Sequence, residues 1–180
     1  DEISIIYKKF GSVTGALTLL KPNDYIDVLG PIGNIFTVNN NEYHPILIGG
    51  GIGLSPIFNL ANNLDEQGIA KTVIIGARPS TEHFLKHDPD KSIFLATDDG
   101  SIGIIGTVID ALNDIMTKID NPKIFACGPK PMLSALQKYL IELDIPGQFS
   151  VESYMACGVG FCQGCVIENR QNHEYHLLIT

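Results

Sequence analysis

The sequence predicts an α/β fold built around a doubly wound parallel sheet, and three observations carry this prediction. Short β-branched runs that end in small residues recur in the middle of the chain, as buried parallel strands do. Segments with helical periodicity and short connections separate these runs. The 180 residues include 44% hydrophobic and 18% charged residues, which suits one full globular domain with a small addition.

The elements of the middle part, residues 44–150, are expected to alternate along the chain. Strands are predicted at 45–50, 72–77, 92–97 and 123–128. Helices are predicted at 55–68 and 106–120. A third helix follows the last strand, with Pro131 in its first turn and one apolar stripe made of Leu133, Leu136, Leu140 and Leu143.

The two flanks, residues 1–43 and 151–180, differ from this middle part. In the first flank, 4–10 and 24–36 are predicted strands, and 11–20 is a turn that enters a short helix or strand. This is too little sequence to close a barrel, and we expect the chain to begin within a domain. The second flank is rich in cysteine and glycine and then becomes polar.

Charge and composition exclude several function classes. The net charge is −8 and lysine and arginine do not cluster, which argues against nucleic acid or anionic lipid as a partner. No run of about 18 apolar residues predicts a membrane span, and the first residues do not resemble a signal peptide. Three of the four cysteines fall within nine residues, unlike a secreted disulfide framework, so we expect a reducing, cytoplasmic compartment.

A glycine-rich turn joins the first predicted strand to the first helix. The stretch 46–56, ILIGGGIGLSP, contains Gly51-x-Gly53-x-x-Pro56. Glycines allow a sharp turn close to a pyrophosphate, and the helix N-terminus favours negative charge. We interpret this as a dinucleotide site, against the alternative of a tight turn without a ligand. Arg78, after the second strand, would permit a 2′-phosphate but is equally compatible with an ordinary surface arginine.

Two further loops follow predicted strands at the same sheet edge. The loop within 96–108 contains Asp98 and Asp99, which suit paired acid–base carboxylates but more often cap a loop and its backbone amides. The stretch FACGPKPM, 125–132, carries Cys127, for which a small buried thiol is the default interpretation. Open α/β sheets bind ligands at this edge.

The C-terminal segment holds Cys157, Cys162 and Cys165 in the spacing Cys-x4-Cys-x2-Cys. This is the plant-type ferredoxin spacing for a [2Fe–2S] cluster, in which a fourth cysteine follows. Zinc, completed by His173 or His176, is the competing interpretation, although zinc sites more often use paired Cys-x2-Cys knuckles. Either the fourth ligand lies beyond Thr180, or this chain cannot hold a stable cluster.

Four stretches in this order resemble a known family. They are Gly51-x-Gly53-x-x-Pro56, TDDGSIGIIG, ACGPKPML and ESYMACGVGFCQGC. Together they are similar to the electron-transfer subunits of type-B dihydroorotate dehydrogenases, within the ferredoxin–NADP⁺ reductase superfamily. The resemblance covers essentially the whole chain, and its cysteine motif is the most specific part.

The resemblance implies a domain and a cofactor for each part of the chain. Residues 1–43 would be the C-terminal part of a truncated FAD-binding barrel, 44–150 an NAD-binding domain, and 151–180 a truncated [2Fe–2S] segment. The three cysteines match cluster ligands, and Gly51, Gly53, Pro56, Asp98, Cys127 and Gly128 match the NAD side. The FAD contacts would come from Ile6, Tyr7, Lys8, Val13 and Thr14, with Val13 where the family often has glycine.

The resemblance also implies a relay in pyrimidine biosynthesis. Dihydroorotate would reduce FMN in a separate catalytic subunit, in a heterotetramer of two plus two chains, and electrons would pass through [2Fe–2S] and FAD to NAD⁺. The alternatives are an electron-transfer subunit of sulfide dehydrogenase or hydrogenase type, or a non-redox nucleotide-binding domain with a zinc knuckle. Met155, Val159 and Phe161 in the cysteine loop either dock the catalytic subunit or fold inward and shield the cluster.

Overall fold

The computed structural model describes residues 3–39, 42–77, 85–162, 164–171 and 174–179, with side chains described as far as Cys165. The chain divides into two compact units. One is the continuous stretch Phe36–Val151, and the other combines Asp1–Ile35 with Glu152–Thr180.

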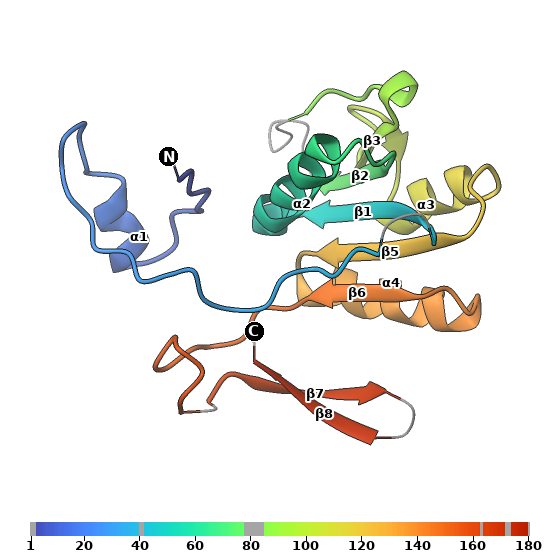
Figure 1. Cartoon of the computed structure of the whole chain (residues 1–180). Coiled ribbons are helices and arrows are strands. Elements are labelled where there is room, and N and C mark those ends of the chain that lie inside the picture. The colour runs from blue at the N-terminus through green and yellow to red at the C-terminus, as the bar shows by residue number, and fades with distance from the viewer. Residues whose placement is uncertain (1–2, 40–41, 78–84, 163, 172–173, 180) are drawn as a thin grey trace. The chain divides into compact units, whose positions relative to one another are not determined.

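A parallel sheet forms the centre of the Phe36–Val151 unit (Figure 1). Its strands lie in the order β4-β3-β2-β1-β5-β6, and each pairs in parallel with its neighbour. Their bounds are β1 His44–Gly50, β2 Thr72–Ala77, β3 Ile93–Thr97, β4 Ile104–Ile105, β5 Pro122–Cys127 and β6 Gly147–Ser150. The order reverses between β1 and β5, so the predicted doubly wound α/β fold is confirmed.

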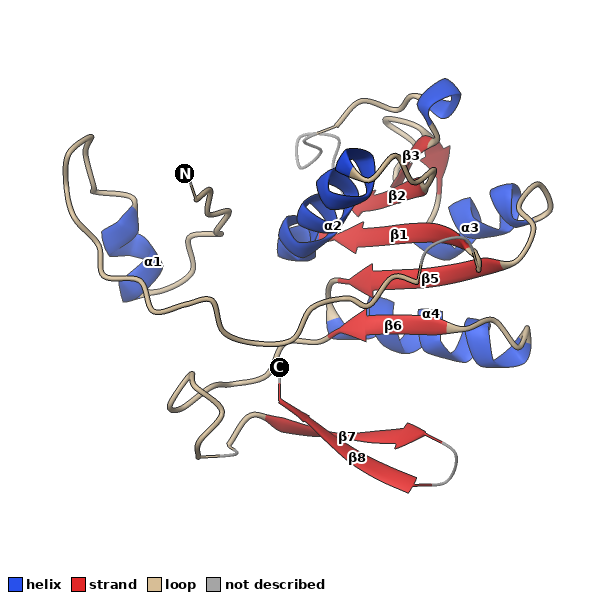
Figure 2. Ribbon diagram, in the orientation of Figure 1, coloured by secondary structure: helices blue, strands red, loops and turns tan. Residues whose placement is uncertain are grey.

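Helices cover both faces of this sheet (Figure 2). Ile46 and Ile48 of β1 belong to the core shared with α3 (Val108–Met116) and α4 (Lys130–Glu142). Leu47, between them, points to the other face, in the core shared with α2 (Leu54–Glu66). The alternation is that of a strand buried on both sides.

The third helix confirms most of the predicted leucine stripe. Leu133, Leu136 and Leu140 are buried against the sheet. The prediction for Leu143 is wrong, because α4 ends at Glu142 and Leu143 is its C-cap residue, with 51% of its surface exposed.

The chain before β1 contributes to the same core as α2. Phe36, Val38 and Tyr43 all pack against that core cluster. The Phe36 ring meets the fully buried Phe125 ring edge-on, with 5.7 Å between centroids. We call residues 36–39 the strap, because this extended stretch fastens the start of the unit to the sheet.

The second unit has little regular structure in its N-terminal part. The helix α1, Ser12–Leu17, settles the predicted short helix or strand at 11–20 as a helix. Within the described residues 3–35 no strand is formed, so the strands predicted at 4–10 and 24–36 are wrong. A strand needs a partner for its N–H and C=O groups, and local β propensity does not supply one.

The C-terminal part of this unit ends in an antiparallel hairpin that the sequence did not predict. Its strands are β7, Val166–Gln171, and β8, Glu174–Ile179. The cysteine segment precedes β7 and leads directly into it.

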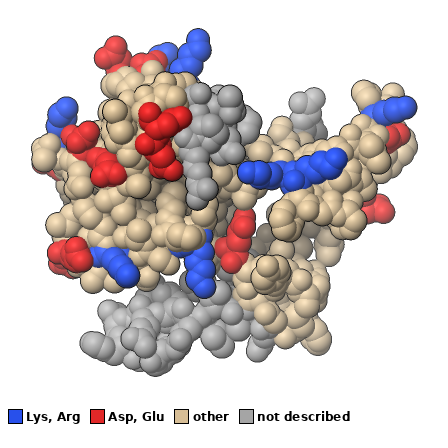
Figure 3. Space-filling view, turned by 180° about the vertical axis from the view of Figure 1, so that it is seen from behind, with Lys and Arg blue, Asp and Glu red and all other residues tan. Residues whose placement is uncertain are grey.

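The charged side chains are dispersed on the face displayed in Figure 3, where lysines lie among aspartates and glutamates. No helix within the described part of the chain has the length and apolar character needed to cross a bilayer.

Candidate functional site

The glycine turn after β1 is built from glycines that serve different purposes. Gly51 has φ +56°, a left-handed conformation that side chains rarely adopt, and a Cβ added there would meet nothing within 4 Å. A Cβ at Gly53 would instead come within 2.4 Å of the carbonyl carbon and oxygen of Cys127. Gly51 therefore allows the turn, and Gly53 allows the close approach of a second loop.

The N-terminus of α2 begins at this turn. Gly51–Gly53 form one 3-10 turn, Gly53 is the N-cap, and Pro56 lies in the first helical turn as predicted. No described side chain caps this end. The Leu54 N–H donates to the carbonyls of Gly51 and Ile52, so the 3-10 turn continues into α2, whose N-terminal, positive dipole end follows the carboxyl end of β1.

The second loop follows β5 and lies at the point where the strand order reverses. Gly49 of β1 pairs with Cys127 of β5, so the two strands end side by side. Cys127 is 3% exposed, as expected for a small buried thiol. The structure therefore brings Gly51, Gly53, Cys127 and Gly128 together at the carboxyl edge of the sheet, where open α/β sheets bind ligands.

Met132 is part of this arrangement, and the sequence analysis missed it. A Cβ at Gly50 would lie 2.7 Å from the Met132 sulfur, and one at Gly128 would lie 2.4 Å from its methyl carbon. The side chain thus fills the hollow that the two glycines leave. In the sequence, a methionine at the start of a helix after a Gly-Pro turn could have indicated this role. Only the fold shows which glycines the methionine faces.

The third loop follows β3, two strands from β1 and roughly 10 Å away at the usual strand spacing. It is fixed by Thr97, which is fully buried and whose Oγ1 donates to the Ile102 carbonyl (2.9 Å). Asp99 Oδ1 accepts the Ser101 N–H (3.0 Å), and hydrogen bonds from Ser101 lower the pKa of this carboxyl. Asp99 is therefore the predicted loop cap, while Asp98 lies exposed beside it.

The cysteine loop presents backbone N–H groups to two of its sulfurs. The Cys162 N–H donates to Cys157 Sγ, and the Gly164 N–H donates to Cys162 Sγ, each at 3.4 Å. Hydrogen bonds from the backbone of Cys162 and then Val159 lower the pKa of the Cys157 thiol to about 6. Gly158 (φ +71°) and Gly160 (φ +78°) supply the left-handed turns between these cysteines.

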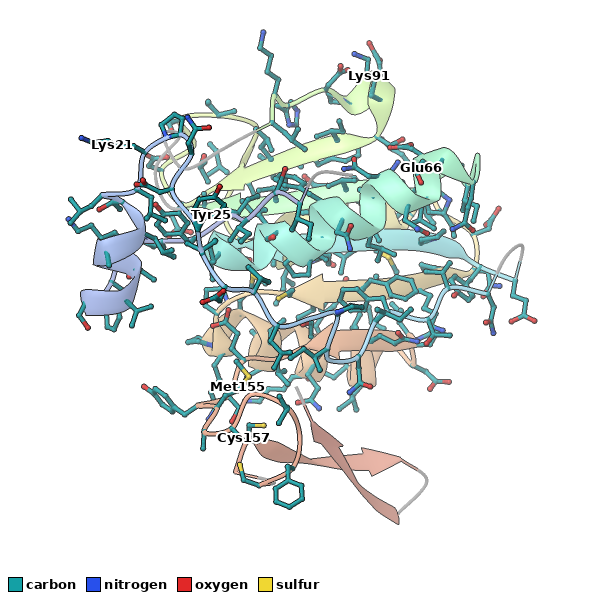
Figure 4. The ribbon with its side chains drawn as sticks, turned by 60° about the vertical axis from the view of Figure 1, so that its left-hand side comes forward. Lys21, Tyr25, Glu66, Lys91, Met155 and Cys157 are labelled. Carbon is teal, nitrogen blue, oxygen red and sulfur yellow. The ribbon has the colours of Figure 1, made fainter. Side chains whose placement is uncertain are left out.

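This donor set fits a thiolate-bound metal group, since N–H donors stabilise negatively charged sulfur. Cys157 and Cys162 are exposed, whereas Cys165 is buried. Figure 4 labels Cys157 on this loop. Within the described residues the three thiols are not gathered into one group that could hold a metal ion. The zinc alternative would need His173 or His176, and the structure describes neither side chain. Arg78, the candidate for a 2′-phosphate, also lies outside the described residues.

The N-terminal residues matched to FAD contacts lie on extended chain and on α1. Ile6 and Tyr7 are 38% and 39% exposed, Val13 is 76% exposed, and Lys8 lies on the same extended stretch. Thr14 Oγ1 accepts the N–H groups of Phe10 (2.8 Å) and Gly11 (3.1 Å). Thr14 thus orders the turn into α1, and the FAD roles of all five residues stay predictions.

Comparisons with known proteins bear on both units. Residues 152–178 match the model for the iron-sulfur cluster binding domain of dihydroorotate dehydrogenase B. A solved structure of an NADH-dependent reduced ferredoxin-NADP oxidoreductase is 29% identical, with a TM-score of 0.76 over 89% of this chain and 59% of that one. The FAD/NAD-binding domain of a Vibrio cholerae nitric oxide dioxygenase, at 19% identity and a TM-score of 0.56, shares the fold.

Curated relatives extend the similarity over nearly the whole chain. The electron transfer subunit of dihydroorotate dehydrogenase B (NAD(+)) from Fusobacterium nucleatum is 34% identical over 96% of this chain and 68% of its own length. The Geobacillus sp. WCH70 subunit is 36% identical, with 64% of its length covered. The probable Archaeoglobus fulgidus subunit is 37% identical, with 70% covered, so this chain spans about two thirds of these relatives. The chain therefore belongs to the family of electron-transfer subunits of dihydroorotate dehydrogenase B.

Proposed function

We propose that this chain passes electrons between an FMN-containing dihydroorotate dehydrogenase catalytic subunit and NAD⁺, by way of a [2Fe–2S] cluster and FAD, in pyrimidine biosynthesis. The cysteine loop carries the proposal, because its thiols receive backbone N–H donors within the stretch that matches the cluster-binding domain. When bound, the three groups supply one-electron chemistry at iron, both one- and two-electron chemistry at flavin, and hydride chemistry at nicotinamide.

The cluster would be held by Cys157, Cys162 and Cys165. The Cys162 and Gly164 N–H groups stabilise the thiolate form of the sulfurs they contact. The glycines between the ligands leave room for the backbone to turn toward the sulfurs.

The dinucleotide would bind at the carboxyl edge of β1 and β5. Here the N-terminal, positive dipole end of α2 would face its pyrophosphate, and Gly51 leaves open space beside the turn. Cys127, Gly128 and Asp98 would lie on the nicotinamide side. We assign no general acid or base, since Asp99 is committed to Ser101 and Cys127 is buried.

The three parts of the chain would divide this work. Residues 1–43 would contribute to the flavin site, with Ile6, Tyr7, Lys8, Val13 and Thr14 as contacts, 44–150 would bind NAD, and 151–180 would hold the cluster. A cytoplasmic location follows from the reduced thiols that iron ligation requires. None of the four cysteines is in a disulfide.

The cysteine loop would also be the docking surface for the catalytic subunit. Electron transfer needs a short path, so the cluster must lie near the subunit boundary. Among the apolar residues of this loop, Tyr154 is 100% exposed, Met155 62%, Val159 46% and Phe161 89%. Figure 4 labels Met155, which precedes Cys157 by two residues. Exposed aromatic anchors of this kind suit a permanent interface, and we propose a heterotetramer of two plus two chains.

The complete subunit, coexpressed with and without the catalytic subunit, tests the proposal. It should be yellow-brown, reduce an artificial dye with NADH, and complete NAD⁺-dependent dihydroorotate oxidation when the partner is added. A colourless protein without NADH–dye reductase activity would contradict it.

A further inference from the structure

Met132, in the first turn of α4, lies between the two glycine-containing turns at which the strand order reverses. Its side chain is partly buried, and its thioether lies against Gly50, at the end of β1, and Gly128, just after β5. We propose that Met132 is a positioning residue for the dinucleotide, because its thioether fixes the separation of the two turns at which the dinucleotide would bind. This inference rests on the proposed function, and all of these residues belong to the Phe36–Val151 unit.

The thioether occupies the space that a side chain would take at either glycine. A Cβ at Gly50 would lie 2.7 Å from Met132 Sδ and 3.3 Å from Pro129 Cδ. A Cβ at Gly128 would lie 2.4 Å from Met132 Cε and 3.2 Å from the backbone N and O of Gly50. The two turns therefore approach each other closely, and one side chain lies against both of them.

Gly50 does not need to be glycine for the sake of its own backbone. Its conformation is extended (φ −142°, ψ 135°), which any residue adopts. Gly51 differs, because its left-handed φ of +56° is itself a reason for glycine. At Gly50 the missing side chain instead leaves the space that the Met132 sulfur fills.

The composition of the two turns makes such a neighbour important for binding. Gly50, Gly51 and Gly53 follow one another closely after β1, and Gly128 follows β5. Glycine loses more backbone freedom on ordering than any other residue. Ordering one freed residue when a ligand binds costs on the order of a tenfold factor in Kd. With the thioether in place the turns are ordered before binding, which favours a low Kd.

Met116 provides a matched control within the same core. It is also partly buried against the core shared by α3 and α4, and it is the last residue of α3. α3 begins after β4 and ends in the connection to the start of β5, so Met116 lies toward the opposite edge of the sheet from the two turns. Truncation of Met116 should remove similar packing without affecting either turn.

The test compares five variants of the complete subunit with the unsubstituted protein. They are Met132→Ala, Met132→Leu, Gly50→Ala, the double variant Met132→Ala/Gly50→Ala and the control Met116→Ala. Calorimetric titration with NAD⁺, which cannot reduce the oxidised flavin, gives the Kd, and urea unfolding gives the midpoint of each variant. Flavin and iron contents show whether the variants carry their cofactors equally.

Met132→Ala should raise the Kd for NAD⁺ by about tenfold, because binding must then order a freed turn. Met132→Leu conserves the volume, so its Kd should stay within about threefold of the unsubstituted value. Met116→Ala should lower the urea midpoint as Met132→Ala does, because both leave a cavity in the core. The Kd of Met116→Ala should nevertheless stay within about twofold, since the two sites are well separated.

Gly50→Ala tests the same contact without emptying the core. Its methyl group would displace the Met132 thioether and should raise the Kd by about tenfold. In the Met132→Ala background the same methyl group enters the emptied hollow. Independent effects would multiply to about a hundredfold, whereas we expect the double variant to stay near tenfold.

Equal Kd values for Met132→Ala and Met116→Ala would make Met132 ordinary core packing and overturn the proposal. An unchanged Kd in Gly50→Ala would overturn it as well, as would effects that multiply in the double variant. If the unsubstituted subunit does not bind NAD⁺ at all, the proposed function fails, and the positioning role fails with it. The urea midpoints of the Gly50 and Met132 variants would still report whether the two residues are in contact.

Discussion

Gly53 and Cys127 belong to loops 74 positions apart in the chain, yet a Cβ on Gly53 would lie 2.4 Å from the Cys127 carbonyl carbon and oxygen. Real Cβ atoms do not come so close, and the obstacle is backbone that cannot rotate away. The contact joins the turn after β1 to the turn after β5, at the place where the strand order reverses.

Gly53→Ala should therefore displace one turn from the other. We expect a loss of about 1–3 kcal/mol in the free energy of unfolding, as for other overpacked sites, and weaker NADH binding. Gly68→Ala is the comparison, since Gly68 also has a positive φ (+69°) but no atom near its Cβ position. Gly68→Ala should lower the free energy of unfolding by about 1 kcal/mol and leave NADH binding unchanged. Urea titrations and NADH titrations give both quantities, and equal NADH affinities in the two variants would contradict the role given to Gly53.

The start of α3 predicts a pH effect on stability. Thr107 Oγ1 accepts the Ile109 N–H (3.2 Å), while Asp110 Oδ2 accepts the Thr107 N–H (2.7 Å). Thr107→Ala should lower the free energy of unfolding by about 1 kcal/mol at neutral pH.

Hydrogen bonds from Thr107 lower the pKa of Asp110 below its ordinary 3.8, so between the folded and the ordinary pKa the unfolded state binds more protons than the folded state.

The stabilisation from Asp110 is consequently complete above its ordinary pKa and is lost as the pH falls through the lowered folded value. Urea unfolding of the unsubstituted protein and of Asp110→Asn from pH 7 down to about pH 3 measures it. The difference in the free energy of unfolding between the two proteins should shrink as the pH falls. A difference that grows on acidification would contradict the assignment.

Cysteine variants separate a ligand from a packing residue. Cys162→Ser should abolish the cluster, because Cys162 carries one sulfur of the motif and receives the Gly164 N–H. Cys127→Ser should retain full iron content, since Cys127 is buried at the end of β5. Iron analysis and visible absorption decide, and loss of iron in both variants would rule out this division of roles.

Phe161→Asp tests the docking surface. Phe161 is 89% exposed, so we expect the variant to keep its cluster spectrum and NADH–dye reductase activity but to lose copurification with the catalytic subunit. Ile141→Asp, at a residue of α4 that is 72% exposed, is the matched control and should still copurify. If Phe161→Asp loses the cluster while the complex still forms, Phe161 shields the cluster and the interface lies elsewhere.

The coenzyme preference is a separate prediction. The curated relatives named above are NAD(+) enzymes, and Arg78 lies outside the described residues. We expect NADH to be preferred over NADPH. Arg78→Ala should change neither the kcat/KM for NADH nor the kcat/KM for NADPH substantially. A large kcat/KM advantage for NADPH that Arg78→Ala removes would contradict this expectation.

The central strands were predictable because they are buried on both sides. The runs at 45–50, 72–77, 92–97 and 123–128 correspond to β1, β2, β3 and β5, whose inner positions are almost all buried. The edge strands were missed for the opposite reason: β4 has two residues, and β6, with the sequence GQFS, is half exposed and has no apolar run. The hairpin β7–β8 includes the polar stretch ENRQ, which gives no strand signal by itself.

Local sequence also revealed only part of the site. The glycine turn and the cysteine spacing are local patterns, so both were recognisable, and the family match at 152–178 supports iron over a zinc knuckle. Met132 against Gly50 and Gln148 against Thr37 are contacts between distant segments, which only the sheet topology creates. The predicted N-terminal strands were wrong because strand formation depends on a partner that local propensity does not reveal.

Electron paramagnetic resonance of the complete subunit, reduced anaerobically with NADH, shows directly whether the chain holds a [2Fe–2S] cluster that NADH can reduce. We expect about two irons per chain and a rhombic [2Fe–2S] signal, which NADH produces only when it can deliver electrons through the flavin. Stoichiometric zinc with no signal after NADH or dithionite would contradict it.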